Sequence, residues 1–292
     1  MKKLTVALIK KLLPVRPADS HKGDYGHTLV VAGSKQFTGA AILCSLGCLR
    51  CGSGLTTAAI PSSLNVQVTK RLPPEVMTVY LPDDEGYISP TAAKIILDFS
   101  SQRKITSIAF GCGISIELCT KIFTERFLLK NRVPIVIDAD GLNNIQKNVK
   151  VLKKMKSDAV ITPHPAELSR LMKISISVIQ KNREKTAKKF AADYGIICVL
   201  KGFETVVTDG KEVFVNTTGN PGMATGGSGD VLTGMIAAFV GQTDSLLEAA
   251  CLGVYLHGLA GDLAAREKTQ ISMLPTDLIE KIPEAIKTVI GL

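Results

Sequence analysis

Short, almost wholly apolar runs alternate along this chain with segments of helical hydrophobic periodicity. The runs at 28–33, 55–60, 76–80, 105–110, 133–137, 159–161 and 196–200 predict strands, and 39–51 predicts a helix. Apolar strands separated by helices are typical of a mainly parallel sheet that helices cover on both faces. The pattern therefore predicts an α/β fold, and no linker or repeat divides it, so we expect one domain over residues 1–292.

The two ends of the chain predict different structures. Residues 205–208 and 213–216 flank Asp209, Gly210 and Lys211, which predicts a hairpin, and the chain from Asp230 onward is helical. Residues 1–20 predict a lead-in with a short surface helix. Their apolar start is interrupted by two lysines and lacks a cleavage site, so we expect a cytoplasmic protein. We expect no membrane span, because the longest uncharged segment, 51–69, is rich in polar residues.

The composition is that of a globular protein with a basic surface. The chain has 46% hydrophobic and 21% charged residues and a net charge of +9. The basic residues concentrate at 147–156 and 173–189, which we interpret as solvated helix faces. Those runs lack interleaved aromatic residues and the chain has no Trp, so we expect no nucleic-acid partner. A positive field would attract small anionic substrates such as nucleotides.

Seven cysteines are scattered through apolar segments, which favours buried thiols over a disulfide framework. Cys44, Cys48 and Cys51 have the spacing of an iron–sulfur site that uses S-adenosylmethionine. They also fall at positions i, i+4 and i+7 of the predicted helix, among aliphatic residues. We interpret them as the core face of that helix.

The glycine-rich run at 216–230 carries the most specific chemistry. It is uncharged until Asp230 and leads directly into the apolar segment 231–240, as a loop leads into a helix N-terminus. Free N–H groups and the helix dipole attract an anion there, so Gly227, Ser228 and Gly229 predict a phosphate-binding turn. Asp230 adds negative charge beside that phosphate. It suits a base that deprotonates the group attacking the phosphate; the alternative is a helix-start residue that the dipole favours.

Further polar residues follow the predicted strands. Glycines follow one strand at 111–113, acids another at 138–140, the segment 162–167 a third, and Lys201 and Gly202 a fourth. The carboxyl ends of parallel strands share one edge of a sheet, where ligands bind. A P-loop motif and a complete dinucleotide fingerprint are both absent, so the glycine-rich run is the predicted anion site.

Together these segments resemble one family, the ADP- or ATP-dependent NAD(P)H-hydrate dehydratases of the ribokinase-like superfamily. The resemblance covers roughly residues 13 to 290, and its matching motifs lie at 20–26, 31–41, 72–75, 111–113, 137–140, 162–167, 201–205 and 219–230. It implies a ribokinase-like three-layer sandwich with a central, mainly parallel sheet. It also implies dehydration of (6S)-NADHX or NADPHX to NADH or NADPH, with ADP or ATP as co-substrate and Mg²⁺ as cofactor.

The resemblance assigns roles to individual residues. The substrate-lining positions are Ala40, Gly113, His164 and Asp230, of which Asp230 is the catalytic base. The nucleotide-binding positions are Lys201, Gly202, Phe203, Glu204, Thr205 and Gly229, and Gly227 and Ser228 add backbone N–H groups. The metal ligands stay open.

Several of these residues have structural alternatives. Lys201 could be a surface lysine, His164 a structural loop histidine, and Glu167 a first-turn helix acid. Asp138 and Asp140 could hold Mg²⁺ through water or cap the next helix. The segment 21–26 could be a mobile loop over the site or a structural lead-in.

Two departures from the family pattern stand out. Cys112 replaces a common Pro between Gly111 and Gly113, from which we expect little effect because both glycines are kept. Only about twenty residues precede the first motif, so we expect a dehydratase alone, with a separate NAD(P)HX epimerase in the cell. The family also implies a homo-oligomer, with a tetramer expected.

Two other functions compete with this interpretation. A small-molecule kinase of the same superfamily, acting on a vitamin precursor or a sugar, would use the same turn but release a stable phosphorylated product. A nucleotide-binding protein without catalysis would not need Asp230. The choice between ADP and ATP, and between NADHX and NADPHX, is not encoded in any of these motifs.

Overall fold

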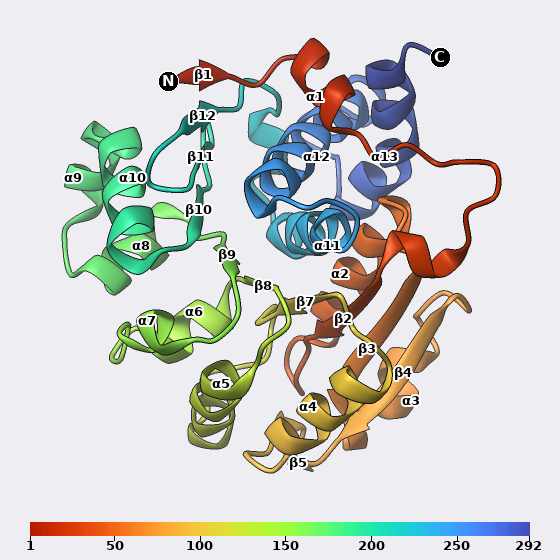
Figure 1. Cartoon of the computed structure of the whole chain (residues 1–292), viewed down its shortest axis with the longest axis vertical. Coiled ribbons are helices and arrows are strands. Elements are labelled where there is room, and N and C mark those ends of the chain that lie inside the picture. Colours follow the sequence, from red (N-terminus) through yellow and green to blue (C-terminus); the bar gives the residue numbers. More distant parts are fainter.

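The computed structural model describes residues 1–292 and contains a ten-stranded sheet between two layers of helices (Figure 1). The strand order is β1-β12-β11-β10-β9-β8-β7-β2-β3-β4. The strands are β1 (Lys2–Lys3), β2 (His27–Val31), β3 (Leu55–Pro61), β4 (Val76–Leu81), β7 (Ser107–Phe110), β8 (Ile135–Ile137), β9 (Ala159–Ile161), β10 (Ile197–Leu200), β11 (Val206–Thr208) and β12 (Val213–Val215). From β10 to β4 every neighbouring pair is parallel, which confirms the predicted sheet.

One edge of the sheet was only partly predicted. The expected hairpin forms between β11 and β12, which are antiparallel. Strand β1 then pairs in parallel with β12, through Lys2 opposite Phe214 and Lys3 opposite Val215. Two lysines carry no hydrophobic pattern, so the sequence gives no sign of this short strand. A separate hairpin, β5 (Asp83–Asp84) with β6 (Tyr87–Ile88), lies outside the main sheet.

Helices cover both faces of the sheet, each over its own apolar core. The first layer contains α1 (Val6–Leu12), α2 (Thr38–Arg50), α3 (Asn65–Thr69), α11 (Ser228–Val240), α12 (Leu246–Lys268) and α13 (Pro275–Ile290). The second contains α4 (Ala92–Gln102), α5 (Leu118–Lys130), α6 (Asp140–Ile145), α7 (Val151–Lys154), α8 (Pro165–Met172), α9 (Ile176–Lys181) and α10 (Arg183–Tyr194). The predicted three-layer α/β arrangement is confirmed; that it is a single domain stays a prediction.

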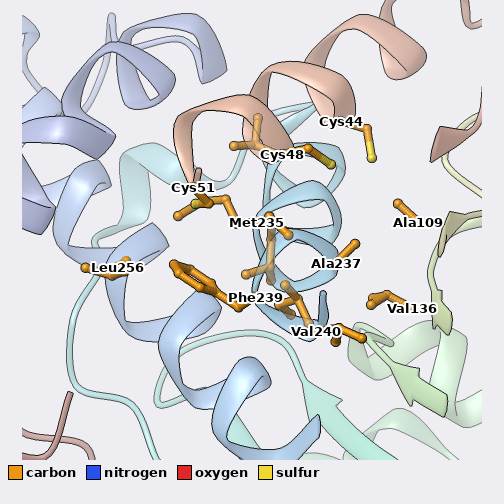
Figure 2. Packing of buried hydrophobic residues seen from close by; sticks show 14 of the residues in the cluster. Cys44, Cys48, Cys51, Ala109, Val136, Met235, Ala237, Phe239, Val240 and Leu256 are labelled. Atoms are coloured by element: carbon orange, nitrogen blue, oxygen red, sulfur yellow. The ribbon is translucent and has the colours of Figure 1, made fainter. Parts of the chain in front are cut away.

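The cysteines of α2 lie on its buried face, as the helical spacing predicted, with Cys48 against α11 and Cys44 on the side of the sheet (Figure 2). Cys44 and Cys48 are fully buried, and the Cys48 thiol donates a hydrogen bond to the Gly234 carbonyl at 3.2 Å. No disulfide forms, and six of the seven thiols are buried. The spacing of Cys44, Cys48 and Cys51 therefore reflects helix packing.

Helix α12 corrects the expectation that no segment could cross a membrane. By length and composition Leu246–Lys268 passes that test, but 67% of its apolar window is buried inside the fold. It packs between α11 and α13, so its hydrophobicity is that of a core helix.

The first part of the chain is a structural lead-in. Helix α1 begins at Val6 after the Thr5 cap and buries Ile9 against the first layer. The segment 21–26 is tied to the start of β3, where the N–H groups of Gly54 and Leu55 donate to Tyr25 and Gly26 at 3.0 Å. That point is the amino end of the parallel strands, so this segment does not cover the edge where the site lies.

Candidate functional site

The polar residues predicted at the strand ends do meet at the carboxyl edge of the sheet. Gly111 follows β7, Asp138 follows β8, Thr162 follows β9 and Lys201 follows β10. These four strands lie next to one another and run parallel in the sheet. The N-terminus of α11 lies over the same edge, because a Cβ built on Gly229 would be 3.4 Å from both Lys201 Nζ and Asp138 Oδ2.

The glycine-rich turn has the conformation that an anion site requires. Gly227 is the N-cap of α11 with φ +98°, a left-handed conformation that glycine adopts at little cost. Ser228 and Gly229 form the first helical positions and Asp230 the third. The Ser228 N–H donates to the Thr225 carbonyl at 3.4 Å. The N–H groups of Gly229 and Asp230 have no intrahelical acceptor and are available to a phosphate.

Asp230 has an environment that makes its carboxylate more basic. Burial raises its pKa to about 6, and the Asp138 carboxylate acts in the same direction. The Cys112 thiol and the positive charge of Lys201 oppose the shift. That Cys112 in place of a proline has little effect stays a prediction. No cation lies within ion-pair distance of Asp230, so the carboxylate is not committed to a salt bridge.

Lys201 is committed to Asp138 instead. Its Nζ lies 2.6 Å from Asp138 Oδ1, and the side chains are 19% and 2% exposed. Burial disfavours the ammonium form, but the carboxylates of Asp138 and Glu167 outweigh it and raise the pKa of Lys201. Thr233, on α11, donates to Asp138 Oδ2 at 2.8 Å and lies 3.0 Å from the Gly229 carbonyl. Lys201 is thus no surface lysine, but a fixed positive charge under the anion turn.

His164 and Glu167 form a capping box at the start of α8. The His164 Nδ1 accepts from the N–H groups of Ala166 and Glu167, and Glu167 Oε2 accepts from the His164 N–H at 2.8 Å. Because Nδ1 accepts these bonds, the neutral ring carries its proton on Nε2. Burial lowers the pKa of His164, and the charges of Lys201 and Arg170 act in the same direction.

Glu167 is more than a first-turn acid. It is 4% exposed, and its Oε2 lies 3.9 Å from Lys201 Nζ. Burial raises the pKa of Glu167, while Lys201 opposes the shift. It therefore belongs to the same buried charge cluster as Asp138.

The structure rules out helix capping by Asp138 and Asp140. The N-cap of α6 is Ala139, which accepts no side-chain capping bond and has φ +50° and ψ −120°, a strained conformation for a residue with a Cβ. Asp140 Oδ2 instead accepts from the Ser115 N–H at 2.9 Å. Asp140 thus holds the loop after β7, while the strained residue before it directs Asp138 into the site.

Two predicted substrate-lining residues lie in contact. A Cβ built on Gly113 would be 2.9 Å from the Ala40 Cβ and 2.6 Å from the Phe37 Cβ. Phe37 is 48% exposed, so an apolar wall stands beside the Gly113 backbone at this edge. Ala40 and Gly113 therefore lie side by side, and their substrate-lining role stays a prediction.

Arg183, to which the sequence assigned no role, holds the start of the predicted nucleotide-binding segment 201–205 in place. Arg183 Nη2 donates to the carbonyls of Leu200 and Lys201 at 2.9 and 3.2 Å, and Gly202 lies against the guanidinium. Thr205 Oγ1 donates to the Gly202 carbonyl at 2.9 Å and closes the turn.

The middle of this segment points outward. Phe203 is 89% exposed, and Glu204 has φ +52° and is also exposed. Neither side chain contacts the buried cluster of Asp138, Glu167 and Lys201, so any nucleotide contact they make lies at the rim of the site.

Thr233 and Arg183 support this cluster, and the sequence alone did not predict their roles. Thr233 lies one helical turn after Asp230, a spacing that could have suggested a shared face. Arg183 carried no such signal, because it falls within a basic stretch interpreted as solvated surface.

Comparisons with known proteins agree with the fold. The family model described as NAD(P)H-hydrate dehydratase matches residues 28–284. The chain belongs to this family. The ADP-dependent (S)-NAD(P)H-hydrate dehydratase of Nitrosopumilus maritimus is 32% identical over 98% of this chain and 97% of its own length. The predicted resemblance is therefore confirmed.

Two further relatives extend the comparison. A crystal structure of the ADP/ATP-dependent NAD(P)H-hydrate dehydratase of Bacillus subtilis, co-crystallised with ATP and Mg²⁺, superposes with a TM-score of 0.84 at 29% identity, covering 99% of this chain and 98% of that one. The bifunctional NAD(P)H-hydrate repair enzyme of Moorella thermoacetica is 40% identical over 97% of this chain, but only 53% of that enzyme is covered. The chain thus spans about half the length of the bifunctional relatives it matches.

Proposed function

We propose that this dehydratase-family protein restores NADH or NADPH from (6S)-NADHX or NADPHX, using ADP or ATP to activate the leaving group. The observation that carries the proposal is the placement of Asp230. A basic, unpaired carboxylate stands in the first turn of α11, beside N–H groups that suit a phosphate. A protein that only bound nucleotide would gain nothing from a carboxylate at that point.

The chemistry follows from the weakness of hydroxide as a leaving group. Asp230 accepts the proton of the ring hydroxyl, whose oxygen attacks the terminal phosphorus of the nucleotide and breaks its bond to the bridging oxygen. The ring nitrogen's electron pair then expels phosphate, and loss of a proton from the adjacent ring carbon forms the double bond. The products are NADH or NADPH, inorganic phosphate and the shortened nucleotide.

The protein supplies positioning and charge to this transfer. Backbone N–H groups of Gly227, Ser228 and Gly229 face the charge that develops on the phosphate, and Lys201 adds a fixed ammonium beneath them. Asp138 keeps that ammonium in place and away from Asp230. Ala40, Gly113 and His164 border the space for the hydrated ring.

The residues present fit Mg²⁺. No group of three or more His, Cys, Asp or Glu side chains is arranged as a metal site. Mg²⁺ in phosphoryl-transfer enzymes is usually held by one or two carboxylates together with phosphate oxygens. Both oxygens of Asp138 already accept hydrogen bonds, Oδ1 from Lys201 and Oδ2 from Thr233, so Asp138 and the nearby Glu167 would hold the ion through its bound water. When bound, the ion would neutralise negative charge on the nucleotide phosphates.

The proposal also covers the protein's location, oligomeric state and partners. We propose a cytoplasmic homotetramer that works beside a separate NAD(P)HX epimerase, without nucleic acid or membrane as partner. The support for the epimerase is the double function named for the longer relatives. Light scattering on a sizing column tests the tetramer, which would have four times the chain mass of 31.1 kDa.

The experiment is to follow the near-ultraviolet absorbance of reduced nicotinamide while the purified protein acts on NADHX or NADPHX with Mg²⁺ and either ADP or ATP. We expect a rise that depends on the nucleotide, and the faster nucleotide and substrate identify the preferred pair. A flat trace with bound nucleotide and a stable phosphorylated product would instead establish a small-molecule kinase.

A further inference from the structure

Helix α12 carries a buried histidine directly beneath the anion turn. His257 is 7% exposed, and its Nε2 lies 2.9 Å from the carbonyl oxygen of Ser228 and 3.4 Å from its hydroxyl. Ser228 is the first residue of α11, between Gly227 and Gly229. No sequence motif includes His257.

The chemistry of this contact fixes the state of the ring. A carbonyl oxygen can only accept, so His257 Nε2 must carry a proton and donate it. Burial lowers the pKa of His257 to about 4; the bond to Ser228 opposes this shift and the charge of Lys201 adds to it. His257 is therefore a neutral imidazole with a fixed donor at neutral pH.

Fixing the Ser228 carbonyl also fixes the next N–H group. The peptide bond between Ser228 and Gly229 is planar and trans, so the Gly229 N–H points opposite to the Ser228 carbonyl. That carbonyl points toward α12, and the Gly229 N–H consequently points out of the helix start. A hydrogen bond accepted by the carbonyl also polarises the N–H of the same peptide and makes it a better donor.

The same helix holds the other end of the glycine-rich loop. Asp262 accepts from the Gly219 N–H at 2.9 Å and from Asn220 Nδ2 at 3.0 Å. Between Asn220 and Ser228 the chain is exposed at 224–226. The loop is therefore anchored to α12 at its two ends and open in its middle, where a ligand can approach.

We propose that His257 is a positioning residue for the nucleotide's terminal phosphate, which it serves by aiming and polarising the Gly229 N–H. This role rests on the proposed use of a nucleotide, but not on the fate of the phosphoryl group. The buried face of α12 would then help to bind the nucleotide as well as fill the core.

The test compares side chains that keep or lose the donor. In His257→Gln the amide nitrogen falls where Nε2 was, whereas in His257→Asn it stops short and in His257→Leu it is absent. Binding of ADP and of adenosine, both with Mg²⁺, is measured by titration calorimetry. We expect the Kd for ADP to rise about tenfold in the Asn and Leu variants and to stay within about threefold in the Gln variant. The Kd for adenosine, which lacks phosphate, should not change.

His27 provides the matched control. It is also 7% exposed and uses both ring nitrogens, bonding Thr57 Oγ1 at 2.8 Å and the Arg103 carbonyl at 3.3 Å, but it lies at the amino end of β2. His27→Leu should lower stability and leave both Kd values unchanged.

Three outcomes would overturn the role. The first is equal ADP binding by the Gln and Asn variants, which also decides the matter if the Leu variant does not fold. The second is parallel loss of adenosine and ADP binding, which would mark a merely structural histidine. The third is a wild-type protein that binds neither ADP nor ATP, which would contradict the use of a nucleotide. If the variants lose ADP binding selectively but the wild type does not dehydrate NADHX or NADPHX, the role of His257 stands and only the proposed reaction is wrong.

Discussion

Asp230 is kept basic by its surroundings, because burial and the Asp138 charge both disfavour its ionised form. Asp230→Asn preserves the shape but cannot accept a proton. We expect kcat to fall by about 100-fold or more, the usual contribution of a general base, while the KM for the nucleotide stays within about threefold. Steady-state kinetics on the wild type and on Asp230→Asn provide the measurement. A variant with turnover near that of the wild type would remove Asp230 from the role of base.

The same substitution should stabilise the fold at high pH. The folded pKa of about 6 lies above the ordinary value of 3.8, so the folded protein binds more protons between these two pH values. Stability contributed by the protonated form is therefore lost as pH rises through that window. Asp230→Asn should raise the free energy of unfolding by up to about 3 kcal/mol at pH 8, with little gain at pH 4.

Urea unfolding at the two pH values measures this difference, and Asp98→Asn, at an exposed position on α4, serves as the control that should show none. A gain from Asp230→Asn that is equal at both pH values would indicate that packing, and not ionisation, explains it.

At the residue scale, the sequence predicted which residues gather but not how they pair. Lys201 was expected to supply positive charge, and it does so from a salt bridge with a residue 63 positions earlier. That pairing depends on β8 and β10 lying two strands apart in the sheet, and local sequence patterns do not predict this strand order. The strained Ala139 is equally unreadable, because alanine gives no sign of a positive φ.

At the element scale, the position of α11 depends on its close approach to α2. A Cβ on Gly234 would lie 2.0 Å from the Cys44 carbonyl oxygen, and one on Gly47 would lie 2.6 Å from the Val231 carbonyl oxygen. The two glycines thus let the two backbones meet. Because Asp230 is one turn before Gly234, this contact also sets the depth of the base in the site.

Gly234→Ala should therefore destabilise the protein and disturb the site. Overpacking at a tight contact costs about 1–3 kcal/mol, and α11 must shift to relieve it, so we expect lower kcat as well as a lower midpoint of thermal unfolding. Gly39→Ala is the matched control, since Gly39 is also helical and a Cβ there meets nothing within 4 Å. That change should be neutral or stabilising by about 0.5–1 kcal/mol. Equal effects of the two substitutions would argue against close packing.

Element prediction succeeded where hydrophobic patterns were strong and failed where pairing alone defines the strand. The buried strands and the β11–β12 hairpin formed as predicted. Strand β1 consists of two lysines whose place is decided by β12, and α12 is apolar along its length because it is buried between α11 and α13. Both outcomes depend on tertiary contacts.

At the scale of the whole molecule, the site exists because parallel strands deliver Asp138, Glu167 and Lys201 to one edge and α11 delivers Asp230 above them. The sequence predicted this edge from the residues that follow each strand. The sequence could not predict which side chains hold this edge in place. His257 and Arg183 do so by donating to the backbone carbonyls of Ser228 and Leu200, which are distant from them in the sequence.

The central claim is that the ring hydroxyl itself attacks the nucleotide's terminal phosphorus. The most direct test uses NADHX prepared with an oxygen-18 hydroxyl and follows the label by phosphorus NMR and mass spectrometry during turnover with unlabelled nucleotide. If the hydroxyl is phosphorylated, the heavy oxygen leaves in inorganic phosphate, one atom per phosphate released. Label recovered in water, with unlabelled phosphate, would contradict it and show that the hydroxyl departs without being phosphorylated.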